Sequence, residues 1–203
     1  MAVKKLLIYG GAFNPPHRGH VSLLSAAMAE VAPDKALVMP SKLSPHKSTK
    51  SVPFWDRYAM CRCFLSIGGV RRSPLEYFLR GKSYTVRTVG ILSRLYPAAQ
   101  IYILIGTDML ATFTEWRDYR ELLLRCVLVA GSRKDDDMAE VASAAALLEN
   151  EGGRVIILNN RVVEVSSTDV RNDIAATGRS SLITDEVEKY IERKGLYSDK
   201  NPV

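Results

Sequence analysis

The chain has few of the residues that build disulfide frameworks and metal centres. It contains 3 cysteines and 3 histidines among 203 residues. An odd number of cysteines without metal-type spacing fits a reducing compartment, and we expect Cys61 and Cys63 to be buried as small hydrophobic residues. No apolar run approaches the roughly 20 residues that span a bilayer. Residues 1–8 resemble the start of a strand and not a secretory leader, so we expect a cytoplasmic protein without a membrane partner.

An excess of acidic residues is also absent. The net charge is +6, which suits a polyanionic partner, either nucleic acid or a small phosphorylated substrate. The basic residues are scattered, with small clusters at residues 42–50 and 71–72, and no basic stripe interleaved with aromatic residues accompanies them. We therefore favour small phosphorylated substrates and expect no nucleic-acid partner.

Apolar residues are plentiful and grouped in short runs. The hydrophobic content of 47% is enough for the core of one α/β domain, which we expect to cover residues 1–203. Runs that are apolar on both faces predict buried strands of a parallel sheet. They are residues 6–9, 35–39, 100–105, 126–130 and 155–158, and residues 70–79 are compatible with a further strand.

Helical spacing predicts the elements between these strands. Phe54, Tyr58, Cys61 and Leu65 share one face of a helix that begins after Pro53, which indicates core packing. Further helices are expected from about His17, from an N-cap at Ser83 or Thr85, over residues 138–150, after Ser166, and over residues 185–194 between Thr184 and Gly195. The part from about residue 166 is therefore predicted to be helical.

Residues 9–20 read Tyr-Gly-Gly-Ala-Phe-Asn-Pro-Pro-His-Arg-Gly-His and follow the first predicted strand. The two glycines allow the backbone to approach a ligand closely, and the two prolines delay the helix until about His17. His17 and His20 would then share one face of the exposed first turn, beside backbone amides that no helical carbonyl accepts. Amides, a helix dipole and two imidazoles predict a site for phosphate oxygens.

Two other interpretations of these histidines are weaker. A zinc pair has this spacing, but the remaining histidine is His46, and no cluster of cysteines or carboxylates accompanies the pair. Purely structural histidines are also disfavoured, because a turn rich in glycine and proline offers little apolar surface in which to bury them.

A second candidate phosphate element covers residues 164–171. A short apolar piece runs into Ser166, Ser167 and Thr168, which are strong N-cap residues, and a helix follows with Val170 and Ile174 facing inward. Arg171 comes one turn into that helix. Hydroxyls, amides and a guanidinium in this arrangement would receive the oxygens of a triphosphate.

The first of these motifs resembles the signature of the nucleotidyltransferase superfamily that shares its core with class I aminoacyl-tRNA synthetases. Six residues match at the required offsets: Gly11, Phe13, Pro15, His17, Gly19 and His20. Residues 165–171 resemble the superfamily's Ile-Ser-Ser-Thr-x-x-Arg motif, with Val165 in place of Ile. The resemblance implies a Rossmann-like doubly wound parallel sheet flanked by helices, with a small helical C-terminal subdomain. It also implies nucleotidyl transfer from a nucleoside triphosphate with loss of pyrophosphate.

Further segments resemble one family within that superfamily, the bacterial nicotinate mononucleotide adenylyltransferases. They are the loop 41–47, Ser83-Tyr84-Thr85 with Thr88, Ile105-Gly106-Thr107-Asp108 with Trp116, and Gly195-Leu196-Tyr197. The sequence departs from the family at Ser41, Ser44 and Arg87, and the role of Arg87 is left open. The resemblance implies transfer of AMP from ATP to nicotinate mononucleotide in NAD biosynthesis, giving nicotinate adenine dinucleotide. The alternatives are a related transferase for nicotinamide mononucleotide or phosphopantetheine, and a nucleotide-binding protein without turnover.

The same resemblance implies a set of site residues. The catalytic residues would be His17, His20 and Arg171. ATP would contact Gly10, Gly11, Ala12, Phe13, His17, Gly19, His20, Lys42, His46, Lys47, Gly106, Asp108, Arg133, Ser166, Ser167, Thr168 and Arg171. Nicotinate mononucleotide would contact Asn14, Tyr84, Thr85, Asp108 and Trp116. Mg²⁺ would bridge the ATP phosphates without dedicated protein ligands, and the protein would act as a monomer or homodimer.

Overall fold

The computed structural model describes residues 2–43, 52–131, 138–159, 163 and 165–198. Within them lies a parallel sheet of six strands in the order β3-β2-β1-β4-β5-β6. The strands are β1 (Lys5–Gly11), β2 (Lys35–Pro40), β3 (Val70–Arg72), β4 (Gln100–Gly106), β5 (Cys126–Gly131) and β6 (Val155–Leu158). The strand order reverses between β1 and β4, which is where doubly wound sheets bind ligands at the carboxyl ends of their strands. The predicted Rossmann-like fold is confirmed.

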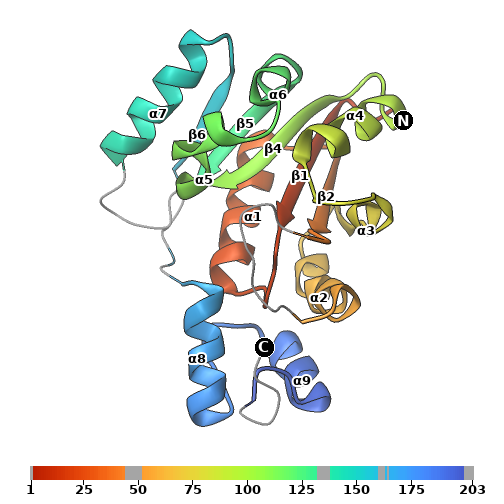
Figure 1. Ribbon diagram of the computed structural model, residues 1–203, viewed down its shortest axis with the longest axis vertical. Coiled ribbons are helices and arrows are strands. Elements are labelled where there is room, and N and C mark those ends of the chain that lie inside the picture. Colours follow the sequence, from red (N-terminus) through yellow and green to blue (C-terminus); the bar gives the residue numbers. More distant parts are fainter. Residues whose placement is uncertain (1, 44–51, 132–137, 160–162, 164, 199–203) are drawn as a thin grey trace.

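Helices cover both faces of the sheet (Figure 1). In chain order they are α1 (Arg18–Val31), α2 (Phe54–Met60), α3 (Leu75–Phe78), α4 (Thr85–Leu95), α5 (Thr107–Ala111), α6 (Tyr119–Arg125), α7 (Met138–Asn150), α8 (Ser167–Thr177) and α9 (Asp185–Lys194), with short 3₁₀ helices η1 (Cys61–Ser66) and η2 (Phe113–Glu115). Helix α1 packs on one face, and α4, α6 and α7 pack on the other. No helix in the described part of the chain is long and apolar enough to cross a membrane.

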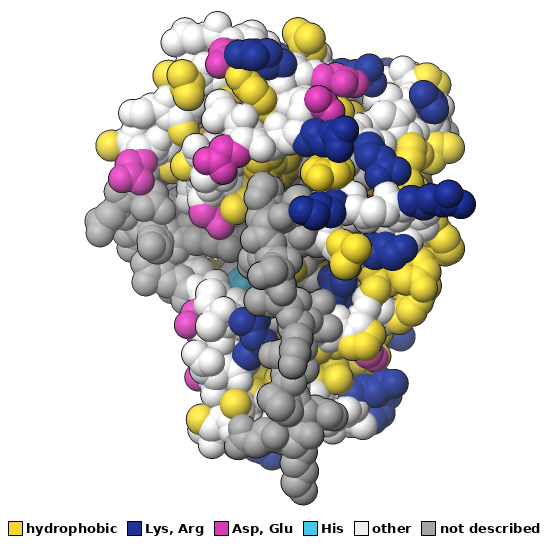
Figure 2. Space-filling model, viewed as in Figure 1, with side chains coloured by type: hydrophobic (Ala, Val, Ile, Leu, Met, Phe, Trp, Pro, Cys, Tyr) yellow, Lys and Arg dark blue, Asp and Glu magenta, His cyan; other side chains and the backbone are white. Residues whose placement is uncertain are grey.

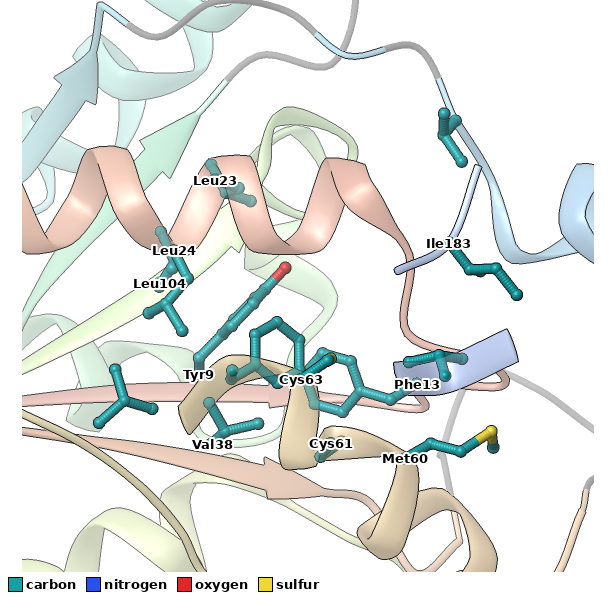
Figure 3. Close-up of a cluster of buried hydrophobic side chains, with 14 of the residues drawn as sticks. Tyr9, Phe13, Leu23, Leu24, Val38, Met60, Cys61, Cys63, Leu104 and Ile183 are labelled. Atoms are coloured by element: carbon teal, nitrogen blue, oxygen red, sulfur yellow. The ribbon is translucent and has the colours of Figure 1, made fainter. Parts of the chain in front are cut away.

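Side chains alternate between the two faces of β1. Leu7 and Tyr9 point into the core under α1, whereas Leu6 and Ile8 point into the core under α4, and all four are buried. This burial on both faces explains why the strand is a continuous apolar run. Figure 3 shows Tyr9 and Phe13 in one cluster with residues of α1, η1 and neighbouring strands.

The C-terminal helices share the core under α1. Val170 and Ile174 of α8, as predicted, and Val187 and Ile191 of α9 are buried in the same cluster as Tyr9. Figure 1 shows α8 and α9 together at one end of the molecule, at the far end from α7. The shared core supports one domain, although its extent over residues 1–203 stays a prediction.

The segment after Pro53 differs from the single helix that the spacing predicts. The α-helix ends at Met60 and the chain continues as the 3₁₀ helix η1. Because a 3₁₀ helix has three residues per turn, the inward face shifts along the sequence. Phe64 is therefore 0% exposed, while Leu65, predicted to face inward, is 40% exposed. The predicted burial of Cys61 and Cys63 is confirmed, and this burial raises the pKa of Cys63 to about 12.

Replacing Phe64 by Ala should lower the free energy of unfolding by about 3–5 kcal/mol, because a fully buried ring is removed and a cavity remains. The ring centroid of Phe64 lies 5.5 Å from that of Phe13 and 6.2 Å from that of Tyr9. Urea unfolding would measure the change. Leu65→Ala is the matched control, with an expected loss of about 0.5 kcal/mol, and equal losses at the two positions would contradict the assignment of the inward face.

Candidate active site

A cavity of about 950 Å³ opens where β1, β2 and β4 end. It is lined by segments far apart in the sequence: the turn after β1, the residues after β2, the first turns of α4 and α5, and the first turn of α8. Figure 2 shows histidine surface deep in a hollow of this face, with Lys and Arg side chains gathered at one side.

Most of the predicted site residues meet in this cavity. Its lining includes Gly10, Gly11, Ala12, Phe13, Asn14, His17, His20, Lys42, Tyr84, Thr85, Gly106, Asp108, Trp116, Ser166, Ser167, Thr168 and Arg171. Gly19 instead packs beneath the site, where an added Cβ would lie 3.1 Å from His17 Nδ1 and from the Val163 carbonyl. His46, Lys47 and Arg133 lie outside the described residues.

The two histidines are not on an exposed turn, as the sequence predicts, but are buried. His17 is 2% exposed and forms the N-cap of α1, and His20 is 8% exposed in its first turn. The prediction fails because Tyr9 and Phe13, two aromatic residues of the motif itself, pack against His20 and supply apolar surface. The ring of Phe13 lies 5.1 Å from that of His20, edge to face, and Phe13 takes a left-handed φ of 47° to reach it.

One hydrogen bond fixes how His20 carries its proton. The backbone N–H of His17 donates to His20 Nδ1 at 3.2 Å. A ring nitrogen that accepts a hydrogen bond carries no proton, so the neutral ring carries its proton on Nε2. His20 can therefore act as a hydrogen-bond donor through Nε2, and the two imidazole centroids lie only 3.6 Å apart.

The two glycines that end β1 have different surroundings. A Cβ on Gly11 would lie 2.9 Å from the Phe13 ring, so glycine is required there for packing. Nothing lies within 4 Å of a Cβ built on Gly10, which borders the cavity. Gly10 therefore leaves space in which a ligand can approach the backbone.

The second phosphate element is bonded directly to the first. Ser167 Oγ donates to the Pro15 carbonyl at 2.9 Å, and Arg171 Nη1 donates to the Asn14 carbonyl at 2.9 Å. Arg171 Nη2 also donates to Thr168 Oγ1. Segments about 150 residues apart are thus joined by side chains that donate to main-chain oxygens.

Ser166 caps α8, as predicted. Its Oγ accepts from the Asp169 N–H at 3.1 Å, and Asp169 Oδ2 accepts from the backbone and side chain of Ser166. These hydrogen bonds hold the pKa of Asp169 below its usual value. The first turn of α8 is therefore fixed in place at the cavity.

Asn14 has a structural partner that the sequence did not indicate. Its side-chain oxygen accepts a hydrogen bond from the Tyr197 hydroxyl at 2.7 Å, and the Asn14 side chain is buried. Burial raises the pKa of Tyr197 above its usual value. Tyr197 belongs to the segment 195–197, which the sequence marked only by its resemblance to the family. Its hydrogen bond holds Asn14 of the first motif in place.

Arg57 is a site residue that sequence reasoning missed. Its guanidinium is buried in the cavity wall and donates to the carbonyls of Ala12, Ser41 and Val52 at 2.6, 2.8 and 3.0 Å. It fixes the turn after β1 against the segment after β2. Its position three residues after Phe54 placed it on the inward face of α2, and this was the signal available in the sequence.

The other end of the cavity carries the predicted acceptor residues. Trp116 is half-buried, and its ring lies against that of Phe113 with 5.0 Å between centroids and 33° between planes. Tyr84 is the N-cap of α4, and Asp108 lies in the first turn of α5. Ser83, predicted as a possible N-cap of this helix, lies one residue before the N-cap. Its Oγ accepts from the Lys42 N–H at 3.0 Å instead of from an amide of α4.

The structure gives Arg87, whose role the sequence left open, a contact within the protein. Its Nη1 donates to the carbonyl of Arg80 at 2.6 Å. This contact connects α4 with the turn before it and gives Arg87 a local structural role.

Comparisons with known proteins agree with this arrangement. The model of the cytidylyltransferase-like family matches residues 8–173. The probable nicotinate-nucleotide adenylyltransferases of Gemmatimonas aurantiaca and Gloeobacter violaceus are 32% and 33% identical to this chain. Each alignment covers 96% of this chain, with 93% of the first relative and 96% of the second.

Solved structures share the fold. The Plasmodium falciparum nicotinic acid mononucleotide adenylyltransferase complexed with NaAD superposes with a TM-score of 0.80 at 17% identity, covering 96% of this chain and 97% of that one. A putative nicotinate-nucleotide adenylyltransferase from Vibrio parahaemolyticus gives 0.67 at 24% identity, covering 96% and 95%. From the family match and the near full-length relatives, the chain belongs to the cytidylyltransferase-like family and, within it, to the nicotinate-nucleotide adenylyltransferases.

Proposed function

We propose that this chain transfers AMP from ATP to nicotinate mononucleotide, giving nicotinate adenine dinucleotide and pyrophosphate in NAD biosynthesis. The observation that carries this function is the meeting of two phosphate elements and a half-buried tryptophan in one cavity. The first turns of α1 and α8 both border this cavity, and helix N-termini bind phosphate groups through their amides and dipoles.

The reaction needs no covalent intermediate on the protein. A 5′-phosphate oxygen of nicotinate mononucleotide would attack the α-phosphorus of ATP, and the bond from that phosphorus to the bridging oxygen would break in line as pyrophosphate leaves. The protein then contributes by holding the two phosphates together and by stabilising charge on the oxygens.

We assign the triphosphate to the end of the cavity that holds the histidines and α8. His20 would donate through Nε2, and His17 would act beside it on the α- and β-phosphate oxygens. Within the part of the chain that the structure describes, Arg171 donates from two of its five N–H groups, and we assign further donors to the triphosphate. The hydroxyl proton of Ser167 is engaged by Pro15, so the contribution of Ser167 would come through its backbone amide.

We assign the acceptor to the end that holds Trp116. The pyridine ring would stack on the indole, and the backbone amide of Thr85, at the start of α4, would face its carboxylate. Asp108 would contact the nucleotide substrate. Lys42, which follows β2, would contribute positive charge to the phosphates.

Nucleotidyltransferases of this kind generally use Mg²⁺, which neutralises phosphate charge during the transfer. The part of the chain that the structure describes holds no group of three His, Cys, Asp or Glu residues suited to a metal ion. That Mg²⁺ is held by the substrate phosphates and water, without dedicated protein ligands, stays a prediction. Action in the cytoplasm, as a monomer or homodimer and without nucleic acid, stays a prediction.

The function is tested by pyrophosphate release with ATP and Mg²⁺ in the presence of one acceptor at a time. Nicotinate mononucleotide should be used at least tenfold better than nicotinamide mononucleotide, and phosphopantetheine should give no release, because it has no ring to stack on Trp116. Preference for phosphopantetheine would contradict the acceptor assignment. Absence of release with all three would favour a nucleotide-binding protein without turnover.

His17→Ala should lower kcat on the order of 10²- to 10³-fold, the scale for loss of one preorganised donor to a phosphate oxygen. Ser25→Ala, on the exposed side of the same helix, is the matched control and should keep wild-type turnover. Single-turnover formation of nicotinate adenine dinucleotide would measure both. A His17→Ala enzyme with near wild-type kcat would rule out the proposed role of His17.

Trp116→Ala should raise KM for nicotinate mononucleotide roughly tenfold to hundredfold while KM for ATP changes little, because stacking is worth about 1–3 kcal/mol. Trp116→Phe should recover part of the loss. The matched control is Trp55→Ala, at the other tryptophan of the chain, which lies in an aromatic cluster on α2 and α3 and outside the cavity lining. Similar effects of the two alanine variants would refute ring stacking at Trp116.

A further inference from the structure

A buried carboxylate lies in the wall of the cavity, between its two ends. Glu76, on the short helix α3, is 6% exposed and lines the cavity. Thr88 Oγ1 donates to Glu76 Oε1 at 3.1 Å, and the Ser83 hydroxyl interacts with the same carboxylate and lowers its pKa. Nothing in the chemistry above uses Glu76.

The bond to Ser83 leads to the segment after β2. Ser83 Oγ accepts from the Lys42 N–H at 3.0 Å, which leaves its hydroxyl proton for the interaction with Glu76. The backbone N–H of Ser83 donates to the Leu43 carbonyl at 3.0 Å. Two hydrogen bonds therefore fasten Ser83 to the segment that carries Lys42.

The hydrogen bond from Thr88 connects Glu76 with α4, whose first turn is assigned to the acceptor. Thr88 is 1% exposed and lies in α4, one turn after Tyr84. Its backbone N–H donates to the Tyr84 carbonyl at 3.4 Å. A single carboxylate thus connects the turn that carries Tyr84 and Thr85 with the backbone at Lys42.

We propose that Glu76 is a positioning residue that sets the distance between the acceptor and the triphosphate by fixing the first turn of α4 against the segment after β2. The inference rests on the proposed function, because it concerns the alignment of the same two substrates. An in-line transfer is sensitive to such alignment, since a misplacement of about 1 Å can cost on the order of 10²-fold in rate.

A purely structural role would be served better by another residue. Burial penalises the ionised form of a carboxyl group and raises the pKa of Glu76. A glutamine of the same shape would avoid this penalty, but its amide nitrogen cannot accept a hydrogen bond. The hydroxyl group that faces this nitrogen would therefore lose its hydrogen-bond acceptor. Glu76→Gln therefore has two opposed effects on stability, the removal of the burial penalty and the loss of one hydrogen bond, whereas its effect on the alignment is only unfavourable.

Steady-state kinetics and thermal unfolding of Glu76→Gln test the proposal. We expect kcat to fall at least tenfold, KM for each substrate to change less than threefold, and Tm to stay level or rise. Ser83→Ala, which removes the same connection from its other end, should also lower kcat at least tenfold. The double variant should be no slower than the slower single variant, because both act on one network.

Glu151→Gln is the matched control. Glu151 also accepts from a hydroxyl, that of Tyr119, but lies outside the cavity lining, so kcat should not change. Wild-type kcat in both Glu76→Gln and Ser83→Ala would overturn the proposal. If Glu76→Gln does not fold, Ser83→Ala decides alone.

Amide hydrogen exchange separates failure of this inference from failure of the proposed function. Peptides that cover residues 40–43 and 83–88 should exchange at least tenfold faster in Glu76→Gln than in the wild type, whether or not any acceptor is turned over. An inactive wild type with this change in exchange would reject the function and keep the connection. Unchanged exchange would reject the connection.

Discussion

The site depends on hydrogen bonds from side chains of α8 to main-chain oxygens of the first motif. Ser167 and Arg171 donate to Pro15 and Asn14, and Tyr197 adds a bond to the Asn14 side chain. The positive ends of two helix dipoles repel each other, and these bonds hold the first turns of α1 and α8 at one cavity against that repulsion. Burial of α8 and α9 in the core under α1 supplies the apolar part of the same attachment.

In the function that we propose, this attachment brings the hydrogen-bond donors for the phosphates together at one place. The positive ends of α1 and α8, the guanidinium of Arg171 and the ring of His20 border the cavity together. Arg57 lies behind them and holds the turn after β1 through carbonyl oxygens. The donors are therefore fixed by the fold before substrate arrives, which is the condition for effective charge stabilisation in a transition state.

The sheet and most lining residues were predictable, because buried parallel strands are apolar runs and the motif residues follow them directly. The burial of His17 and His20 was not, since it depends on Phe13 and Gly19 packing around them in three dimensions. Arg57 and Glu76 were also missed, because a charged residue in a short helix resembles a surface residue until its partners are known. The 3₁₀ turn that exposes Leu65 has no strong signal in its sequence.

The bond between Tyr197 and Asn14 joins residues 183 positions apart. During synthesis, Asn14 leaves the ribosome long before Tyr197 and α8 exist as folded partners. The sheet can form from β1 to β5 in that interval, but the phosphate site stays incomplete until the final helices dock. Contacts of such long range are made late and slowly in folding. A nascent chain would therefore form most of its sheet before it gains the ability to bind a nucleotide.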